Sequence, residues 1–155
     1  MNSILILDSI RSAQNVGSLF RTADAAGISN IYLVGITPLP VDQFNRPQKE
    51  IAKTALGAEK TISWTHAKTI APLLKKIKKD GYTIIAIEQS KNSVDYKKIK
   101  PNGNTAFLLG NEVDGVSPKT LALCDIVAEI PMNGKKESLN VSVAGGIALF
   151  RILNR

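Results

Sequence analysis

Residues 130–144 decide the fold and read IPMNGKKESLNVSVA. An apolar strand at 126–130 leads into this stretch and stops at Pro131, and an apolar-periodic segment follows it as far as Leu153. Ser138 and Asn140 lie where a helix needs acceptors for its unpaired N–H groups, so either residue can cap that helix. The stretch therefore predicts a strand-turn-helix connection. Turns at the carboxyl ends of strands in an α/β sheet are where ligands usually bind.

The composition is that of one globular domain. The chain has 155 residues and a mass of 16.7 kDa, with 44% hydrophobic and 21% charged residues. This length can bury a core and has no room for a second domain, so we expect a single domain over residues 1–155. No apolar run approaches the ~18 to 20 residues of a membrane span, and the N-terminus lacks a signal-type pattern. We therefore expect a cytoplasmic protein with no membrane partner.

Residue counts limit the possible sites and partners. Cys124 is the only cysteine and His66 the only histidine, which argues against disulfides within the chain and against Cys- or His-based metal sites. The net charge of +7 and the pI near 9.6 favour a polyanionic partner. A solvated lysine-rich surface explains the same charge, and charge alone does not separate RNA from DNA or acidic membranes.

Apolar strands alternate with amphipathic helices along the chain. Short apolar runs typical of parallel strands occur at 4–7, 31–34, 82–87, 106–109 and 126–130, and a further short strand is possible at 61–64. A first helix is predicted from the N-cap Asn15 to the stop signal Gly27, and a second over 68–79 with Pro72 in its first turn. The polar, proline-containing residues 35–47 predict a surface loop. The alternation predicts an α/β fold with right-handed crossovers.

Two further stretches join a strand to a helix through glycine. Residues 15–27 read NVGSLFRTADAAG, and residues 106–118 read AFLLGNEVDGVSP. In the second stretch Ser117 caps a helix that has Pro118 at its first position, and Gly110 and Gly115 let the backbone approach a ligand closely. The glycine patterns of dinucleotide-binding and P-loop proteins are absent, which argues against a nucleotide-binding oxidoreductase.

The three stretches, in this order, resemble the three signature motifs of the SpoU (TrmH) family of RNA ribose 2′-O-methyltransferases, within the SPOUT superfamily. Residues 15–23 match the first motif, Asn-x-Gly-x-x-x-Arg-Thr-Ala, and residues 108–115 match the second, Leu-x-Gly-x-Glu-x-x-Gly. Residues 130–144 match the third, and residues 53–59 resemble a segment that family members carry between the first two. The match extends from Leu7 to Phe150.

The resemblance implies a fold, an activity and a cofactor. The family fold is a single-domain α/β structure with a mostly parallel sheet, helices on both faces and a C-terminal trefoil knot. Family enzymes transfer a methyl group from S-adenosylmethionine to a ribose 2′-hydroxyl of tRNA or rRNA. The cofactor residues carried over are Ile87, Glu88, Leu109, Gly110, Ile130, Met132, Ser138 and Leu139. Main-chain groups would do most of the binding, because a tight fold preorganises them.

The resemblance also implies roles in catalysis and RNA binding. Arg21 is the residue expected at the ribose hydroxyl. It acts either as a phosphate clamp that stabilises negative charge or as a base, and we favour the clamp because a pKa above ~12 makes arginine a poor base. The residues expected to orient Arg21 and the ribose are Asn15, Glu112, Ser138 and Asn140, with Glu112 as an acceptor for Arg21 or for backbone N–H groups. The residues expected to contact RNA are Arg11, Arg21, Arg46, Lys53, Lys135 and Lys136, and DNA is not expected as a partner.

The family active site combines the arginine of one subunit with cofactor held by the other, which implies a homodimer. Leu149, Phe150 and Ile152 either supply its apolar contact or belong to the intramolecular core. The alternative function is a catalytically inactive RNA-binding or ribosome-assembly module that retains the fold.

Overall fold

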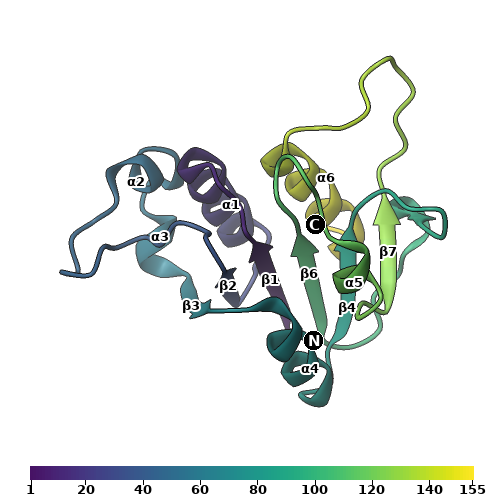
Figure 1. The fold of residues 1–155 in the computed structure, drawn as a ribbon, viewed down its shortest axis with the longest axis horizontal. Helices are drawn as coiled ribbons and strands as arrows, with labels where there is room; N and C mark the ends of the chain where they lie inside the picture. The colour runs from purple at the N-terminus through teal and green to yellow at the C-terminus, as the bar shows by residue number, and fades with distance from the viewer.

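The computed structural model describes all of residues 1–155. Figure 1 shows one sheet with helices on both faces. The sheet has 7 strands in the order β3-β2-β1-β6-β4-β7-β5, and every neighbouring pair is parallel. The strands are β1 (Ser3–Asp8), β2 (Asn30–Val34), β3 (Ser63–Ala67), β4 (Thr83–Ile87), β5 (Val94–Asp95), β6 (Thr105–Leu109) and β7 (Ile126–Glu129). The helices are α1 (Ala13–Ala25), α2 (Lys49–Ala55), α3 (Ala58–Thr61), α4 (Ile70–Lys79), the 3-10 helix η1 (Tyr96–Lys98), α5 (Pro118–Leu121) and α6 (Val141–Leu153). The predicted α/β class with a parallel sheet is confirmed.

The side chains of β1 alternate between two cores. Leu5 and Leu7 belong to the larger core, which includes α1 and α6, while Ile4 and Ile6 belong to the smaller core, which includes α4. All four are at most 4% exposed. A strand buried on both faces must be apolar at every position, which is why the run at 4–7 predicts this type of strand correctly.

The strand order brings the three motif segments to one edge of the sheet. β6 lies between β1 and β4, and β7 lies beside β4. Because all strands are parallel, their carboxyl ends lie on the same side, at the upper edge in Figure 1. The chain segments 88–90, 110–116 and 130–140 and the start of α1 therefore meet at this edge, as expected for a ligand site in such a sheet.

Two helix caps differ from or refine the sequence prediction. α1 begins at Ala13 rather than after Asn15, because the Ser12 hydroxyl accepts the N–H of Asn15 and caps the helix. The prediction of Asn15 as N-cap was wrong, and its side chain is therefore free for other contacts. Of the two candidate caps for α6, Asn140 is the one used: its Oδ1 accepts the N–H of Ser142 at 2.9 Å.

One local prediction of secondary structure needs correction, and further short elements occur where none was predicted. The segments 49–55 and 58–61 form the short helices α2 and α3, and the third strand spans Ser63–Ala67 instead of 61–64. The polar segment 90–104 contains β5 and η1. These elements are too short for a periodic apolar pattern, and their formation depends on packing against neighbours.

Two glycines permit close packing of helices. A Cβ at Gly17 would overlap the main-chain carbonyl of Ile51 in α2, so only glycine allows α1 and α2 to approach as they do. A Cβ at Gly145 would lie 2.7 Å from the Leu19 side chain and 2.9 Å from that of Leu109. Close packing thus explains Gly145, which by itself weakens α6 by about 1 kcal/mol relative to alanine.

No helix of the chain combines the length and the apolar sequence that crossing a bilayer requires. The His, Cys, Asp and Glu side chains form no group of three that could hold a metal ion. Cys124 is half-buried, and burial raises the pKa of its thiol to about 11. The trefoil knot and the cytoplasmic location stay predictions.

Candidate functional site

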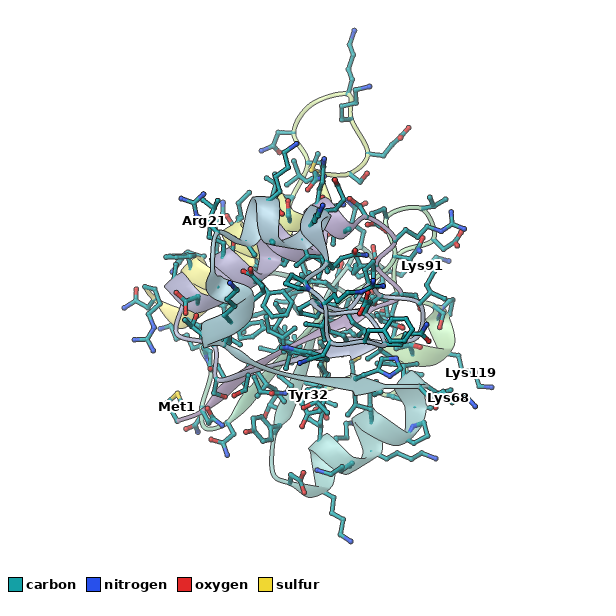
Figure 2. All side chains as sticks on the ribbon, turned by 90° about the vertical axis from the view of Figure 1, so that its left-hand side faces the viewer. Met1, Arg21, Tyr32, Lys68, Lys91 and Lys119 are labelled. Carbon is teal, nitrogen blue, oxygen red and sulfur yellow. The ribbon has the colours of Figure 1, made fainter.

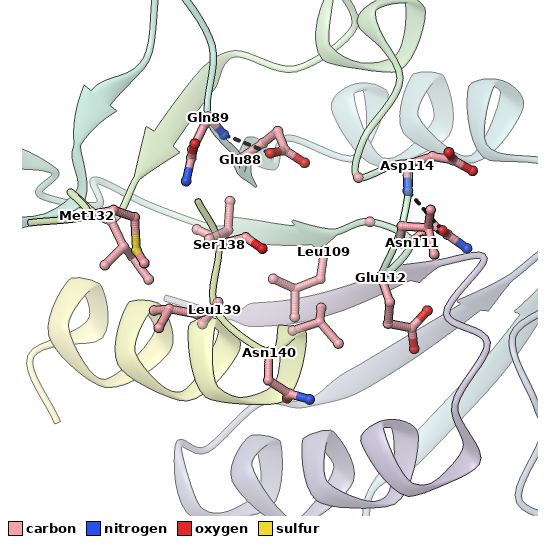
Figure 3. A pocket seen from close by; sticks show the side chains of 17 residues that line it. Glu88, Gln89, Leu109, Asn111, Glu112, Asp114, Met132, Ser138, Leu139 and Asn140 are labelled. Carbon is pink, nitrogen blue, oxygen red and sulfur yellow. Dashed lines mark hydrogen bonds between the residues drawn. The ribbon is translucent and has the colours of Figure 1, made fainter. Parts of the chain in front are cut away.

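A cavity of about 290 Å³ lies at the carboxyl edge of the sheet, bounded by the ends of β4, β6 and β7 and the start of α6 (Figure 3). Its lining includes every residue predicted to hold the cofactor: Ile87, Glu88, Leu109, Gly110, Ile130, Met132, Ser138 and Leu139. The other lining residues are Gln89, Asn111, Glu112, Val113, Asp114, Gly115, Asn140, Val141 and Ala144. The volume is near the lower limit for small-molecule sites, and the mixed apolar and polar lining is typical of them.

The loop after β6 forms one wall by folding back on itself. Gly115 donates its N–H to the Asn111 carbonyl at 2.9 Å, and Asn111 Oδ1 accepts the N–H groups of Val113 and Asp114. Gly115 has φ of +64°, which disfavours a side chain, and a Cβ at Gly110 would collide with the Gly115 main chain. The two glycines of the second motif are therefore required by this turn.

Glu88 braces the same wall from β4. Its Oε2 accepts the N–H of Val116 at 2.9 Å, and its Oε1 accepts the N–H of Gln89 at 2.8 Å. Both carboxylate oxygens are thus engaged in holding the loop. Glu88 shapes the cavity in this structure, and direct contact with a cofactor stays a prediction.

The segment 131–139 contributes Met132, Ser138 and Leu139 to the opposite wall. None of its N–H or C=O groups forms a hydrogen bond with another main-chain group. The segment forms one hydrogen bond with the rest of the chain, in which Gln89 Nε2 donates to the Glu137 carbonyl at 2.7 Å. Exposed main-chain donors and acceptors must find partners in water or in a ligand. This wall can therefore bind a small polar group through the backbone.

A chain of hydrogen bonds connects the three motifs beside the cavity. Asn15 in α1 donates from Nδ2 to Glu112 Oε1 at 3.1 Å and accepts at Oδ1 from Asn140 Nδ2 at 3.1 Å. Glu112 also accepts the N–H groups of Arg11 at 2.8 Å and Ser12 at 3.0 Å. Three of the five predicted catalytic residues are thus in direct contact, one from each motif.

Glu112 is held as a carboxylate. Burial raises its pKa, but the N–H groups of Arg11 and Ser12 and the Asn15 amide lower the pKa further, so the net shift is downward. The prediction that Glu112 accepts hydrogen bonds from backbone N–H groups is confirmed, and its partner is not Arg21. A lowered pKa also makes Glu112 a weaker base.

Ser138 and Arg21 occupy different places. Ser138 lines the cavity and its hydroxyl has no hydrogen-bond partner within the chain, so it is free to contact a ligand. Arg21 is exposed on α1, is absent from the cavity lining and projects outward in Figure 2. It lies six residues after Asn15, which is about 9 Å along the helix axis. Within one subunit, Arg21 does not join the other four predicted catalytic residues.

Apart from Arg21, the residues predicted to bind RNA divide into two groups. Arg11, Lys135 and Lys136 are exposed at the cavity edge, the two lysines in the loop that projects at the top of Figure 1. Arg46 and Lys53 are exposed near α2, on the far side of α1. Their placement is compatible with a long anionic ligand, and RNA contact by each stays a prediction.

A model of the SpoU rRNA Methylase family matches residues 2–150. The chain belongs to the SpoU family. The resemblance of the three motifs is therefore confirmed. The α/β fold is confirmed as well: this chain matches the crystal structure of the AdoMet-bound rRNA methyltransferase from Sinorhizobium meliloti with a TM-score of 0.88 and 32% sequence identity. That similarity covers 99% of this chain and 56% of the other.

Two further SpoU-type proteins are similar. RlmB of Neisseria meningitidis, a 23S rRNA (guanosine-2′-O-)-methyltransferase, is 35% identical over 146 residues, which is 94% of this chain and 56% of RlmB. The structure of the A. aeolicus TrmH/SpoU tRNA modifying enzyme has a TM-score of 0.85 at 28% identity and matches 99% of this chain and 74% of that one. The chain spans little more than half the length of the curated relative.

Two residues that shape the site in this SpoU-family chain were not among the predicted site residues. Gln89 holds the segment 131–139, and Asn111 builds the turn after β6 and donates from Nδ2 to the Ser9 carbonyl at 2.8 Å. Asn111 lies inside the second motif, where its position between Gly110 and Glu112 could have identified it. Gln89 follows a strand end, and no local pattern singles it out.

Proposed function

We propose that this chain is an S-adenosylmethionine-dependent RNA methyltransferase that modifies a ribose 2′-hydroxyl of tRNA or rRNA. The observation that carries the proposal is the hydrogen-bonded chain Glu112–Asn15–Asn140, which ties one residue of each motif to the rim of a single cavity. The sheet topology brings the three segments to one edge, and there their polar side chains contact one another beside the cavity. DNA is not expected as a substrate, because it lacks the 2′-hydroxyl.

The cavity fits the cofactor. Ile87, Leu109, Ile130, Met132 and Leu139 provide apolar surface for a flat ring, and the unpaired main-chain groups of 131–139 provide donors and acceptors for its polar atoms. Backbone groups fixed by the fold lose little freedom on binding, which favours affinity. The bound S-adenosylmethionine of a relative from Sinorhizobium meliloti, at 32% identity, supports the same assignment.

The reaction forms a bond from the ribose 2′-oxygen to the methyl carbon and breaks the bond from that carbon to sulfur. The cofactor supplies an electrophilic methyl group on a positively charged sulfur, which leaves as a neutral thioether. The hydroxyl proton is lost to solvent. The protein must hold the oxygen in line with the methyl group and stabilise charge on that oxygen. We assign this role to Arg21, with Ser138, Asn15 and Asn140 positioning the ribose.

The position of Arg21 supports action across a homodimer. Along α6, beside α1, Val143, Ile147 and Phe150 are 48%, 37% and 37% exposed, which forms an uncovered apolar stripe. Gly146 of α6 lies next to Thr22, the neighbour of Arg21. Leu149 and Ile152, which sequence reasoning left as possible contacts, are buried in the core. A second copy seated on the α1–α6 surface would cover the stripe and bring each Arg21 toward the cavity of its partner.

The decisive experiment is transfer of a labelled methyl group from S-adenosylmethionine to bulk tRNA and rRNA, followed by nucleoside analysis for 2′-O-methylribose. We expect transfer by the wild type, and loss of transfer by Arg21→Ala with cofactor affinity unchanged. Cofactor binding without transfer to any RNA would instead favour the inactive RNA-binding module. Absence of cofactor binding would refute both the activity and the assignment of the cavity.

A further inference from the structure

Phe44 is the most exposed phenylalanine of the chain. It is 67% exposed, whereas Phe20 and Phe107 are fully buried and Phe150 is 37% exposed. Phe44 lies in the segment 41–47, within the connection from β2 to α2 that forms the outermost part of the molecule beyond α2 in Figure 1. The core does not explain this ring, because it contributes nothing to core packing.

The segment 41–47 is braced as a rigid turn. Asp42 Oδ1 accepts the N–H groups of Phe44 at 2.8 Å and Arg46 at 2.9 Å, and the Asp42 N–H donates to the Arg46 carbonyl. Val41 and Pro47 form an antiparallel bridge at its base. Asn45 has φ of +60°, a conformation that asparagine tolerates better than most residues. The ring of Phe44 is thus presented on a preorganised support, which lowers the entropic cost of binding.

One face of the Phe44 ring is already paired. The Arg46 guanidinium lies over the ring, with Cζ at 5.0 Å from the ring centroid, and Arg46 Nε donates to Asp42 Oδ2 at 2.7 Å. The ion pair holds the guanidinium in place and partly neutralises it. Arg46 therefore serves better as one layer of a stack than as a free phosphate ligand, which refines its predicted role. Phe44 remains 67% exposed with Arg46 in place, which leaves room for a second layer.

The surroundings of Phe44 are polar, and three cations, Arg46, Lys49 and Lys53, outnumber two anions, Asp42 and Glu50. Gln43 and Asn45, on either side of it, are exposed. Lys49 and Lys53 follow at i, i+4 spacing on α2, and both are exposed. A lone aromatic ring with a basic rim suits single-stranded nucleic acid, in which bases stack and phosphates pair with cations. A protein-binding surface would instead present a contiguous apolar patch.

We propose that Phe44 is a stacking platform for an unpaired base of the RNA substrate, with Arg46 on the opposite face of the ring and Lys49 and Lys53 contacting the adjacent phosphates. This inference rests on the proposed function and adds to it a substrate class, namely RNA with an unpaired nucleotide near the target. Figure 2 views the molecule from the side of this segment, and Arg21 lies at the margin of that view.

The test is the binding of a fluorescein-labelled oligouridylate to the full chain without cofactor, over a range of KCl concentrations. We expect Phe44→Ala to weaken binding roughly 5- to 150-fold, the effect of losing one stacked base, and Phe44→Trp to retain it. The matched control is Val94→Ala, which truncates an exposed apolar side chain at the opposite edge of the sheet. A blunt RNA duplex of equal length should not distinguish Phe44→Ala from the wild type.

The salt dependence separates stacking from charge. Phe44→Ala should leave the slope of log affinity against log salt unchanged, whereas Lys49→Ala should reduce its magnitude by about 0.7, the value for one phosphate on a single strand. Wild-type affinity in Phe44→Ala would overturn the inference, and so would a loss of self-association with RNA affinity intact, which would assign the ring to a protein contact. Because cofactor is absent from this assay, failure here is distinct from failure of methyl transfer.

Discussion

If Arg21 serves the cavity of the partner subunit, two inactive variants should restore activity when they are mixed. The first variant is Arg21→Ala, which leaves the cavity intact. The second is Met132→Arg, which places bulk and positive charge on the cavity wall, where the positively charged cofactor would bind, and leaves Arg21 intact. Met132 lies in the segment 131–139 and is not part of the hydrophobic core. We expect each homodimer to be inactive.

The size of the recovery follows from the geometry. Random exchange of equal amounts makes half of the dimers mixed, and in each mixed dimer one of the two sites pairs an intact Arg21 with an intact cavity. The mixture should therefore recover about a quarter of the wild-type activity. If Arg21 acted within its own subunit, every site in the mixed dimer would carry one defect. No activity would then return.

The assay is labelled methyl transfer to RNA after the two variants are mixed and allowed to exchange subunits. The extent of exchange is measured separately, with differently tagged copies. Cofactor binding by Arg21→Ala and its absence in Met132→Arg provide the controls. No recovery in a fully exchanged mixture would refute action across the interface. A monomeric wild type would refute the homodimer itself.

Three other predictions concern stability and reactivity. Gly17→Ala should lower the free energy of unfolding by about 1–3 kcal/mol in a denaturant titration, because its Cβ would overlap the Ile51 carbonyl. The control Gly134→Ala should leave the free energy of unfolding unchanged, because a Cβ at Gly134 meets no atom within 4 Å. The pKa of Glu112 is lowered in the folded protein, so its carboxylate stabilises the fold at pH values above 4.5, its ordinary pKa. This contribution is lost as the pH falls through the lowered pKa of the folded state. Glu112→Gln should therefore flatten the acid limb of a plot of unfolding free energy against pH, and an unchanged limb would contradict this. With a pKa of about 11, Cys124 should be ionised in about one molecule per thousand at pH 8, so thiol reagents should react slowly with the native protein and rapidly after unfolding.

Local patterns predicted most of the scaffold because its physical causes are local. Strands such as β1 and β6 bury both faces, so they need continuous apolar runs that can be recognised in the sequence. α4 has the expected amphipathic spacing and ends where the sequence indicated, at Lys79. The short helices α2 and α3 were missed because their stability comes from contact with α1, which the local sequence does not reveal.

In the candidate site, too, some features follow from the local sequence and others only from the fold. The sequence by itself determined which residues belong to the motifs, because close main-chain packing in the turn at 110–115 demands glycine whatever the rest of the chain does. The tertiary structure alone decided how they meet: Asn15 contacts Glu112 and Asn140 across 97 and 125 residues of chain. It also decided that Arg21 lies outside the cavity of its own subunit, because the cavity is lined only by residues from Ile87 onward, whose position relative to α1 is set by the fold. Separations of this length leave no periodic trace in a sequence.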